Sequence, residues 1–235
     1  MIKMGVIIPT VNTVTEPEMN AIKPDGVTVH FTRMPIHFHP EEDDYQGLMN
    51  DLQVRLDEFA LFEADIIAYN CTVGSIACPT DMLTTKLESI GAPGVATAPS
   101  VIHALKTLGA TKISMATPYP DEVNEHEKAY LESHGLTVLK MAGMEFGVGE
   151  PERGRKFAEV QEDVAYAHAL SVDHLEAEAI FLSCANFRTA GLVERLETGM
   201  GKPVITSNVA TFWAALRKGG VETRIDGYGR LLRNF

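Results

Sequence analysis

Residues 65–75 read Asp-Ile-Ile-Ala-Tyr-Asn-Cys-Thr-Val-Gly-Ser, a short apolar run that ends abruptly in small polar residues. This pattern is typical of a buried parallel strand whose last residues reach the ligand-binding edge of a sheet. Residues 179–189 read Ala-Ile-Phe-Leu-Ser-Cys-Ala-Asn-Phe-Arg-Thr and repeat the pattern. The two stretches place Cys71 and Cys184 at equivalent strand ends, and we interpret this pair as the centre of a catalytic site.

The similarity between the two halves extends beyond the cysteines. Residues 3–8 form a buried-strand pattern that ends at Pro9, and residues 111–119 mirror it. The two cysteines are 113 positions apart, and the valines of a later strand in each half, Val95 and Val204, are 109 apart. Nearly equal offsets indicate a duplicated unit of about half the chain. Because strands alternate with helices, each half is predicted to be α/β with a mostly parallel sheet.

The remaining elements follow from hydrophobic periodicity and turn residues. We expect further strands over residues 26–32, 93–98, 136–141 and 203–207, and helices over residues 45–63, 82–90, 100–108, 121–133 and 210–218. One or two helices are expected over residues 156–177, and another begins near Glu16. Residues 33–45 contain two histidines, two prolines and four consecutive acids. This composition predicts a loop over the site or at its rim.

The 235-residue chain is acidic, with a formal net charge of -12. Nucleic acids and anionic membranes require a basic surface, so neither is an expected partner. No apolar run approaches the roughly 20 residues of a membrane span, and the chain begins with a strand rather than a signal peptide. We therefore expect a cytoplasmic protein. Three cysteines without a paired CxxC pattern indicate reduced thiols rather than a disulfide framework or a zinc site.

Two thiols that face one substrate from opposite sides can act as base and acid in turn. A thiol beside backbone N–H donors, or at a helix start, is expected to have a lowered pKa, which makes the thiolate available near neutral pH. Such a pair can invert a carbon next to a carboxylate, or add one sulfur to an activated alkene while the other moves a proton. A lone buried cysteine is more commonly a small apolar side chain, which is our interpretation of Cys78.

Both reactions place negative charge on a carboxylate, which fixed hydrogen-bond donors must stabilise. Polar residues at the strand ends supply such donors: Thr10, Asn12, Thr13, Thr72, Ser75, Thr117, Tyr119, Asn186, Thr189, Thr206, Ser207 and Asn208. This chemistry needs no cofactor, and no GxGxxG fingerprint follows the first strand. A metal is not expected, because His37 and His39 have no evident third ligand. Arg188 can clamp a carboxylate or lie on a solvated helix.

The chain resembles the aspartate/glutamate racemase superfamily, and within it the group of maleate cis-trans isomerases and arylmalonate decarboxylases. The resemblance covers essentially the whole chain. Its motifs are residues 9–13, Asn70-Cys71-Thr72, Ala116-Thr117-Pro118-Tyr119, Asp121-Glu122-Val123-Asn124, Leu182-Ser183-Cys184, Phe212-Trp213 and Gly227-Tyr228-Gly229-Arg230.

This resemblance implies two pseudo-symmetric, doubly wound α/β domains with mostly parallel sheets and the active site in the cleft between them. The final helical segment is implied to cross back, so that residues 1–96 and 206–235 form one domain and residues 97–205 the other. Cys71 and Cys184 are implied to be the catalytic pair, with Asn12 on a substrate carboxylate and Tyr119 on an oxyanion. The candidate substrate-binding residues are Pro9, Thr10, Asn12, Thr72, Val73, Tyr119, Ala185 and Asn186.

The leading hypothesis is a cofactor-independent isomerase of a small dicarboxylic acid, most like the conversion of maleate to fumarate, with Cys71 as nucleophile and Cys184 as its acid/base partner. Arylmalonate decarboxylases resemble the tail strongly but have glycine in place of Cys71, so two thiols favour an isomerase or racemase. Residues 185–189 differ from the usual maleate isomerase continuation, which leaves the acid itself open. The alternatives are an amino-acid racemase, an arylmalonate-type decarboxylase with Cys184 as proton donor, and a non-catalytic small-acid-binding domain. The resemblance also implies a homo-oligomer, dimer or larger.

Overall fold

The computed structural model describes the whole chain, residues 1–235. The first half contributes the strands β1 (Ile2–Pro9), β2 (Val27–Met34), β3 (Ile66–Tyr69) and β4 (Gly94–Ala96), and the second half β5 (Lys112–Ala116), β6 (Thr137–Ala142), β7 (Ala179–Leu182) and β8 (Val204–Thr206). They form two parallel sheets with the orders β2-β1-β3-β4 and β6-β5-β7-β8. The predicted fold class, with the same topology in both halves, is confirmed.

Helices connect successive strands in both halves. The first half contains α1 (Thr15–Ile22), η1 (Pro40–Asp43), α2 (Gln46–Leu61), α3 (Thr72–Ile76), α4 (Thr80–Leu87), η2 (Glu88–Ile90) and α5 (Thr97–Thr107). The second half contains α6 (Asp121–Ser133), α7 (Glu152–Glu159), α8 (Glu162–Ser171), η3 (Ala190–Leu192), α9 (Val193–Met200), α10 (Ser207–Lys218) and α11 (Arg230–Asn234).

The strand order determines where a ligand can bind. In each sheet the chain moves from its first strand to one neighbour and then returns to the other side, so the order reverses between β1 and β3 and between β5 and β7. Ligands of open parallel sheets bind beyond the carboxyl ends of the strands at such a reversal. Cys71 lies two residues after the end of β3, and Cys184 lies two residues after the end of β7. The topology thus places both thiols at reversal points.

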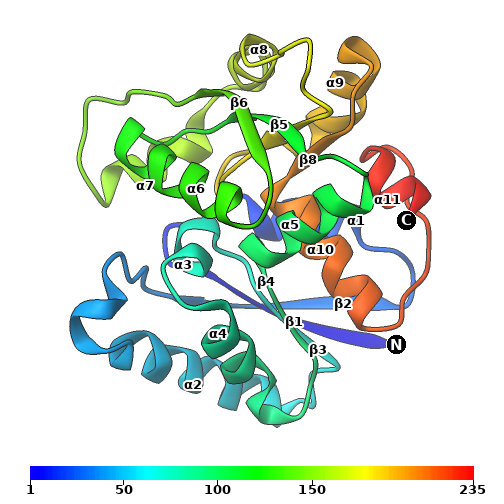
Figure 1. Cartoon of the computed structure of the whole chain (residues 1–235). Coiled ribbons are helices and arrows are strands. Elements are labelled where there is room, and N and C mark those ends of the chain that lie inside the picture. The colour runs from blue at the N-terminus through cyan, green and yellow to red at the C-terminus, as the bar shows by residue number, and fades with distance from the viewer.

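The two sheets are joined through α5 and α10, which lie between them (Figure 1). These helices pack against each other and against β4 and β8. Every residue of α10 from Ser207 to Leu216 is buried, which reflects its position between the two layers. One large hydrophobic core therefore includes residues of both halves, and a smaller one lies under α2 and α4. The division into residues 1–96 with 206–235, and 97–205, stays a prediction.

Several helices differ from the sequence-based expectation. The short helix α3 directly after Cys71 was not predicted, because five residues give no readable period. Both α5 and α10 begin three residues earlier than expected, since the preceding strands are only three residues long. The Thr206 hydroxyl caps α10 by accepting a hydrogen bond from the Val209 N–H at 3.1 Å. The region over 156–177, where one or two helices were expected, has two, α7 and α8.

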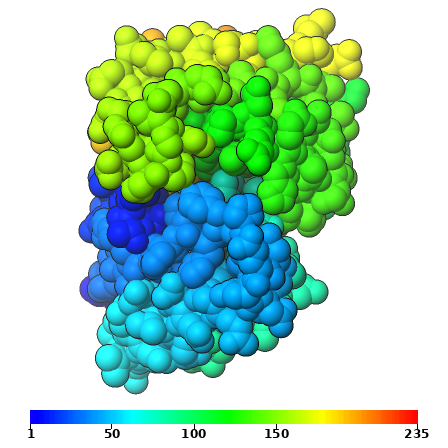
Figure 2. Space-filling view, turned by 90° about the vertical axis from the view of Figure 1, so that its left-hand side faces the viewer, coloured from blue at the N-terminus to red at the C-terminus, as the bar shows by residue number.

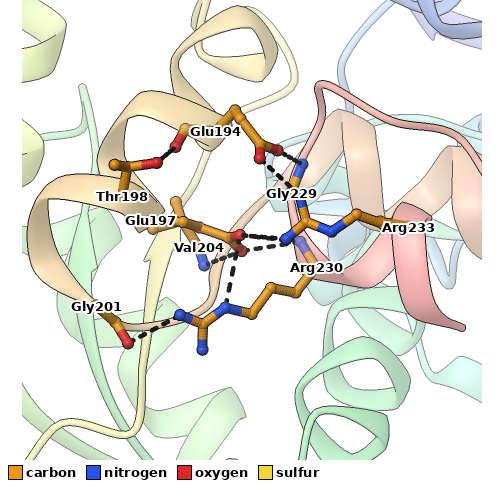
Figure 3. Close-up of polar contacts among 8 residues, drawn as sticks. All are labelled: Glu194, Glu197, Thr198, Gly201, Val204, Gly229, Arg230 and Arg233. Atoms are coloured by element: carbon orange, nitrogen blue, oxygen red, sulfur yellow. Dashed lines mark hydrogen bonds and ion pairs between the residues drawn. The ribbon is translucent and has the colours of Figure 1, made fainter.

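The C-terminal segment is anchored to α9 by a charged network (Figure 3). The buried Glu197 carboxylate accepts hydrogen bonds from the backbone N–H groups of Val204 and Arg230, both at 3.0 Å. Glu194 pairs with Arg233 at 2.6 Å. These contacts join α11 and the preceding Gly229-Arg230 motif to α9 of the second half.

Candidate active site

A cavity of about 520 Å³ lies beyond the carboxyl ends of both sheets. Both Cys71 and Cys184 line it, although only 3% and 5% of their surfaces are exposed. The rim includes residues 36–39 of the first half and Glu150, Arg153 and Gly154 of the second. Figure 2 views the side of the molecule where the blue segment around residues 30–50 faces the green segments of the second half.

Cys71 occupies the N-cap position of α3, and its Sγ accepts a hydrogen bond from the Gly74 N–H at 3.4 Å. The hydroxyl of the buried Tyr69, the last residue of β3, lies beside the same thiol and lowers its pKa. The space around the sulfur is fully occupied on this side. A Cβ on Gly74 would overlap with the Tyr69 hydroxyl and lie 3.1 Å from the Cys71 Sγ. Glycine at position 74 is therefore what permits the contact between Tyr69 and Cys71.

Cys184 lies on a strained backbone, with φ of 101°. This region disfavours residues with a Cβ, and non-glycine residues held there cluster at functional sites. Its Sγ accepts a hydrogen bond from the Asn186 N–H at 3.3 Å. The Tyr119 hydroxyl lies beside the thiol and lowers its pKa. Each thiol thus has one backbone donor and one buried tyrosine.

The direction of the thiol pKa shifts differs from the expectation. Burial raises the pKa of Cys71 to about 11 and that of Cys184 to about 12, although the backbone and tyrosine donors lower both. The expected lowering was wrong, because removing a thiolate from water costs more than these donors return. Both groups are thiols at neutral pH in the free protein.

One hydroxyl connects the two cysteine loops. The Ser207 Oγ, at the first position of α10, accepts a hydrogen bond from the Cys184 N–H at 3.0 Å and from the Thr72 hydroxyl at 2.9 Å. Thr72 directly follows Cys71. The backbone of the second thiol is therefore linked to the first residue of α3 through a single buried side chain.

A polar network beneath the cavity fixes the Cys184 loop. The Asn208 amide donates to the Ala185 carbonyl at 3.1 Å and to the Glu18 carboxyl at 2.6 Å, and accepts from Asn70 at 2.7 Å. The other Glu18 oxygen accepts the N–H groups of residues 189–190 at 2.9 Å. Glu18 comes from α1, so this network joins the first unit to the loop that carries the second thiol.

Backbone N–H groups without a partner in the protein lie beside both thiols, among them those of Val11, Thr72, Val73 and Ala185. Thr72 and Val73 form the first turn of α3, where N–H groups lack intrahelical acceptors. Ala185 follows Cys184, and Val11 follows β1. Donors of this kind, grouped around one cavity, can hold carboxylate oxygens.

The candidate substrate-binding residues differ in whether they line the cavity. Seven of them line the cavity: Pro9, Asn12, Thr72, Val73, Tyr119, Ala185 and Asn186. Thr10 is exposed and does not line it. The side-chain amide of Asn12 bonds within the protein, to Thr15, Val14 and the Ala185 carbonyl. That of Asn186 accepts the Thr13 N–H and donates to the Gly154 carbonyl. In this structure both amides orient loops.

From the sequence, Cys78 was interpreted as structural and the role of Arg188 was left open. Cys78 is buried outside the cavity, in the smaller core. Arg188 is exposed and lies away from the cavity, in a shallow hollow beside Glu18. His37 lines the cavity and its Nε2 is 2.8 Å from the Asp51 carboxylate.

Sequence reasoning missed two buried groups at the site. Tyr69 resembled a core aromatic, and only its position two residues before Cys71 could have suggested the contact. Glu127 lines the cavity and bonds to the Ser183 hydroxyl at 2.6 Å. It lies in an acid-rich helix, where a solvent-facing role was the natural expectation. No helix of the structure combines the length and apolar character required to cross a membrane.

Comparison with known proteins gives a consistent relationship. The family model described as arylmalonate decarboxylase matches residues 4–232. A maleate isomerase of Alcaligenes faecalis is 25% identical, over 98% of this chain and 96% of that protein. An arylmalonate decarboxylase of Bordetella bronchiseptica is 33% identical, over 61% of this chain and 59% of that protein.

A solved structure gives the most detailed comparison. It is a cysteine-to-serine mutant of the Nocardia farcinica maleate cis-trans isomerase with a covalently bound succinylcysteine intermediate. It matches with a TM-score of 0.86 and 25% identity, covering 100% of this chain and 99% of that chain. The resemblance inferred from the sequence motifs is thereby confirmed.

Proposed function

This chain belongs to the arylmalonate decarboxylase family, and we propose that within it the protein is a cofactor-independent cis-trans isomerase of a small dicarboxylic acid, with maleate as the first candidate. One observation carries the proposal: two buried thiols, Cys71 and Cys184, reach the same cavity from two different sheets. A binding domain has no need for such a pair, whereas addition to an alkene and transfer of a proton require one each.

In the proposed reaction, Cys71 first loses its proton to solvent and its sulfur forms a bond to one alkene carbon of maleate. The π electrons move onto the other carbon and its carboxylate, and Cys184 gives its proton to that carbon. Rotation about the new single bond follows. Cys184 then takes one proton back from the same carbon, the double bond re-forms as the C–S bond breaks, and Cys71 leaves as thiolate.

The unpartnered N–H groups of Val11, Thr72, Val73 and Ala185 are proposed to hold the two carboxylates. Thr72 and Val73 lie beside the attacking sulfur, and Ala185 lies beside the proton donor. Charge that develops on a carboxylate during the addition would be stabilised by donors already in position. The Tyr119 hydroxyl lies beside Cys184 at the cavity, and we propose that it donates to the enediolate oxygen. Asn12 and Asn186 would act by positioning loops.

The relatives support a nucleophilic cysteine. The Nocardia protein carries a succinyl group on cysteine, which is the adduct expected from addition of a thiol to maleate or fumarate. The alternative within the family is decarboxylation of a malonate, which uses a single thiol as proton donor. Racemisation of an amino acid by the two thiols is the other candidate. Cys71 distinguishes the isomerase from the decarboxylase, because only the former needs it.

The test is proton NMR of maleate in deuterated buffer, with the wild-type protein and the variants Cys71→Ser, Cys184→Ser and Cys78→Ser. We expect fumarate from the wild type and from Cys78→Ser, whose buried thiol lies outside the cavity. Loss of turnover is expected in both other variants. Parallel tubes contain aspartate, glutamate and phenylmalonate. Deuterium at the α-carbon of an amino acid would replace the proposal with a racemase. Release of carbon dioxide from phenylmalonate, retained in Cys71→Ser, would replace it with a decarboxylase.

Two further features belong to the proposal. The three cysteines are all free thiols, which supports the predicted cytoplasmic location. The homo-oligomer, dimer or larger, that the family resemblance implies is also part of the proposal. Light scattering coupled to gel filtration tests the assembly, and a monomeric mass would contradict it.

A further inference from the structure

A third titratable side chain, Glu127 of α6, lies in the wall of the cavity. It is 1% exposed, and its Oε1 accepts the hydrogen bond from the Ser183 hydroxyl at 2.6 Å. Its Oε2 is also buried but has no hydrogen-bond partner in the protein. Buried polar atoms without a partner are rare in folded proteins. An unpartnered oxygen at a cavity wall therefore marks a position for a ligand atom.

The charges around the cavity decide which form of Glu127 suits an anionic ligand. Glu122 and Glu150 also line the cavity, and Arg153 is the single lysine or arginine that does so. The Arg153 Nε donates to the Val148 carbonyl at 3.1 Å and lies 3.9 Å from Glu150. Cationic charge is thus scarce. An ionised Glu127 would repel a bound dicarboxylate, whereas its acid form can donate a hydrogen bond to it.

We propose that Glu127 binds the substrate as a neutral carboxylic acid, whose Oε2 carries a proton and donates it in a hydrogen bond to a substrate carboxylate. The proposal rests on the dicarboxylate substrate class given above. Binding above neutral pH takes up one proton from solvent, and release of product returns it. Glu127 thereby adds a donor to the backbone N–H groups without adding positive charge.

The electrostatics of the free protein support this assignment. Burial raises the pKa of Glu127 to about 7, while the hydrogen bond from Ser183 lowers it. A carboxylate arriving nearby favours the acid form further. The other titratable or charged groups that line the cavity are Glu122, His126, Tyr119, Cys184, Cys71, Glu150, Arg153, His37 and His39. Asp121, Glu125, Lys128, Tyr130 and Glu132 also belong to α6, and His168 belongs to α8. The buried thiols and phenols stay neutral near pH 7, because burial raises the pKa of each.

The test is calorimetric titration with succinate, a saturated dicarboxylate that cannot react, in buffers of different ionisation enthalpy. We expect uptake of nearly one proton per succinate at about pH 8.5 and little uptake at about pH 6. The dissociation constant should weaken by close to tenfold per pH unit above neutrality. Glu127→Gln keeps a donor and removes the titration, so its affinity should not change with pH. Glu125→Gln, an exposed acid of the same helix, should match the wild type.

A second variant separates this role from a structural one. Ser183→Ala removes the hydrogen bond that lowers the Glu127 pKa, so the midpoint of proton uptake should move to higher pH. Wild-type binding without proton uptake, or uptake that persists in Glu127→Gln, would overturn the proposal. If maleate is isomerised without proton uptake, only the role of Glu127 fails. If succinate does not bind and maleate is not turned over, the proposed function fails with it.

Discussion

The Ser207 hydroxyl accepts the backbone N–H of Cys184 at 3.0 Å, while the same oxygen accepts the Thr72 hydroxyl. The two reactive loops, which come from different sheets, therefore share one buried acceptor. The relative positions of the two cysteine loops therefore depend on this one hydroxyl.

Ser207→Ala is expected to lower kcat by about tenfold or more, because small displacements of reacting groups are costly. The variant leaves the Cys184 N–H and the Thr72 hydroxyl without an acceptor, which should also destabilise the fold by about 1–3 kcal/mol. Steady-state kinetics and chemical denaturation measure the two effects. The exposed Ser133→Ala is the control. Unchanged kcat in Ser207→Ala would show that the loops are held independently.

Gly74→Ala should lose most activity, since the added Cβ would overlap with the Tyr69 hydroxyl and press on the Cys71 sulfur. Removing that hydroxyl in the double variant Tyr69→Phe/Gly74→Ala should restore part of the stability lost in the single variant. Thermal unfolding of the two single variants and the double variant gives the coupling. Gly199→Ala serves as control, because its added Cβ would come no closer than 3.4 Å to another group, the Tyr166 hydroxyl. Strictly additive effects would contradict the steric explanation.

The raised thiol pKa values predict the pH dependence of kcat. Cys71 has a pKa of about 11, so its thiolate fraction grows close to tenfold per pH unit through the neutral and mildly alkaline range. With saturating maleate, kcat should rise accordingly. Tyr69→Phe removes a donor that lowers this pKa, so its kcat should be smaller at each pH with a similar slope. A pH-independent kcat would mean that proton loss from Cys71 does not limit the reaction.

Glu18 predicts a pH dependence of stability. Burial raises its pKa to about 7 from the usual 4.5, so the folded protein holds a proton that the unfolded chain releases. The free energy of unfolding should therefore fall as pH rises from about 5 to about 8, by up to about 3 kcal/mol for this group. Glu127 adds a change of the same sign.

Denaturation of Glu18→Gln at several pH values isolates the Glu18 contribution. The variant should be less stable than the wild type at low pH. The Gln amide has only one oxygen, whereas both oxygens of Glu18 accept hydrogen bonds. Its stability should fall less steeply with pH. The exposed Glu132→Gln should keep the wild-type dependence, and an equal slope in all three proteins would argue against the assignment.

The sequence predicted the parts of the site that depend on local pattern. An apolar run followed by small polar residues occurs once in each half, and this pattern was enough to place Cys71 and Cys184 at strand ends. The sequence could not predict the raised pKa values of the two thiols, because their burial depends on how the two sheets pack together. The same limit applies to Tyr69 and Glu127, whose side chains meet the site only after folding. Asn12 shows the opposite case, since its position was predicted but its amide is committed to the protein itself.

The placement of α10 has a consequence for synthesis on the ribosome. This helix packs against β3 and β4 of the first sheet, yet it is formed by residues 207–218, near the end of the chain. The first sheet is synthesised early, whereas the helix that covers one of its faces is synthesised near the end. Until then an apolar surface stays open, and such surfaces expose a nascent chain to aggregation and to chaperones. The two halves therefore cannot complete their folding one after the other. The N-terminal half reaches its final packing only after α10 has been synthesised.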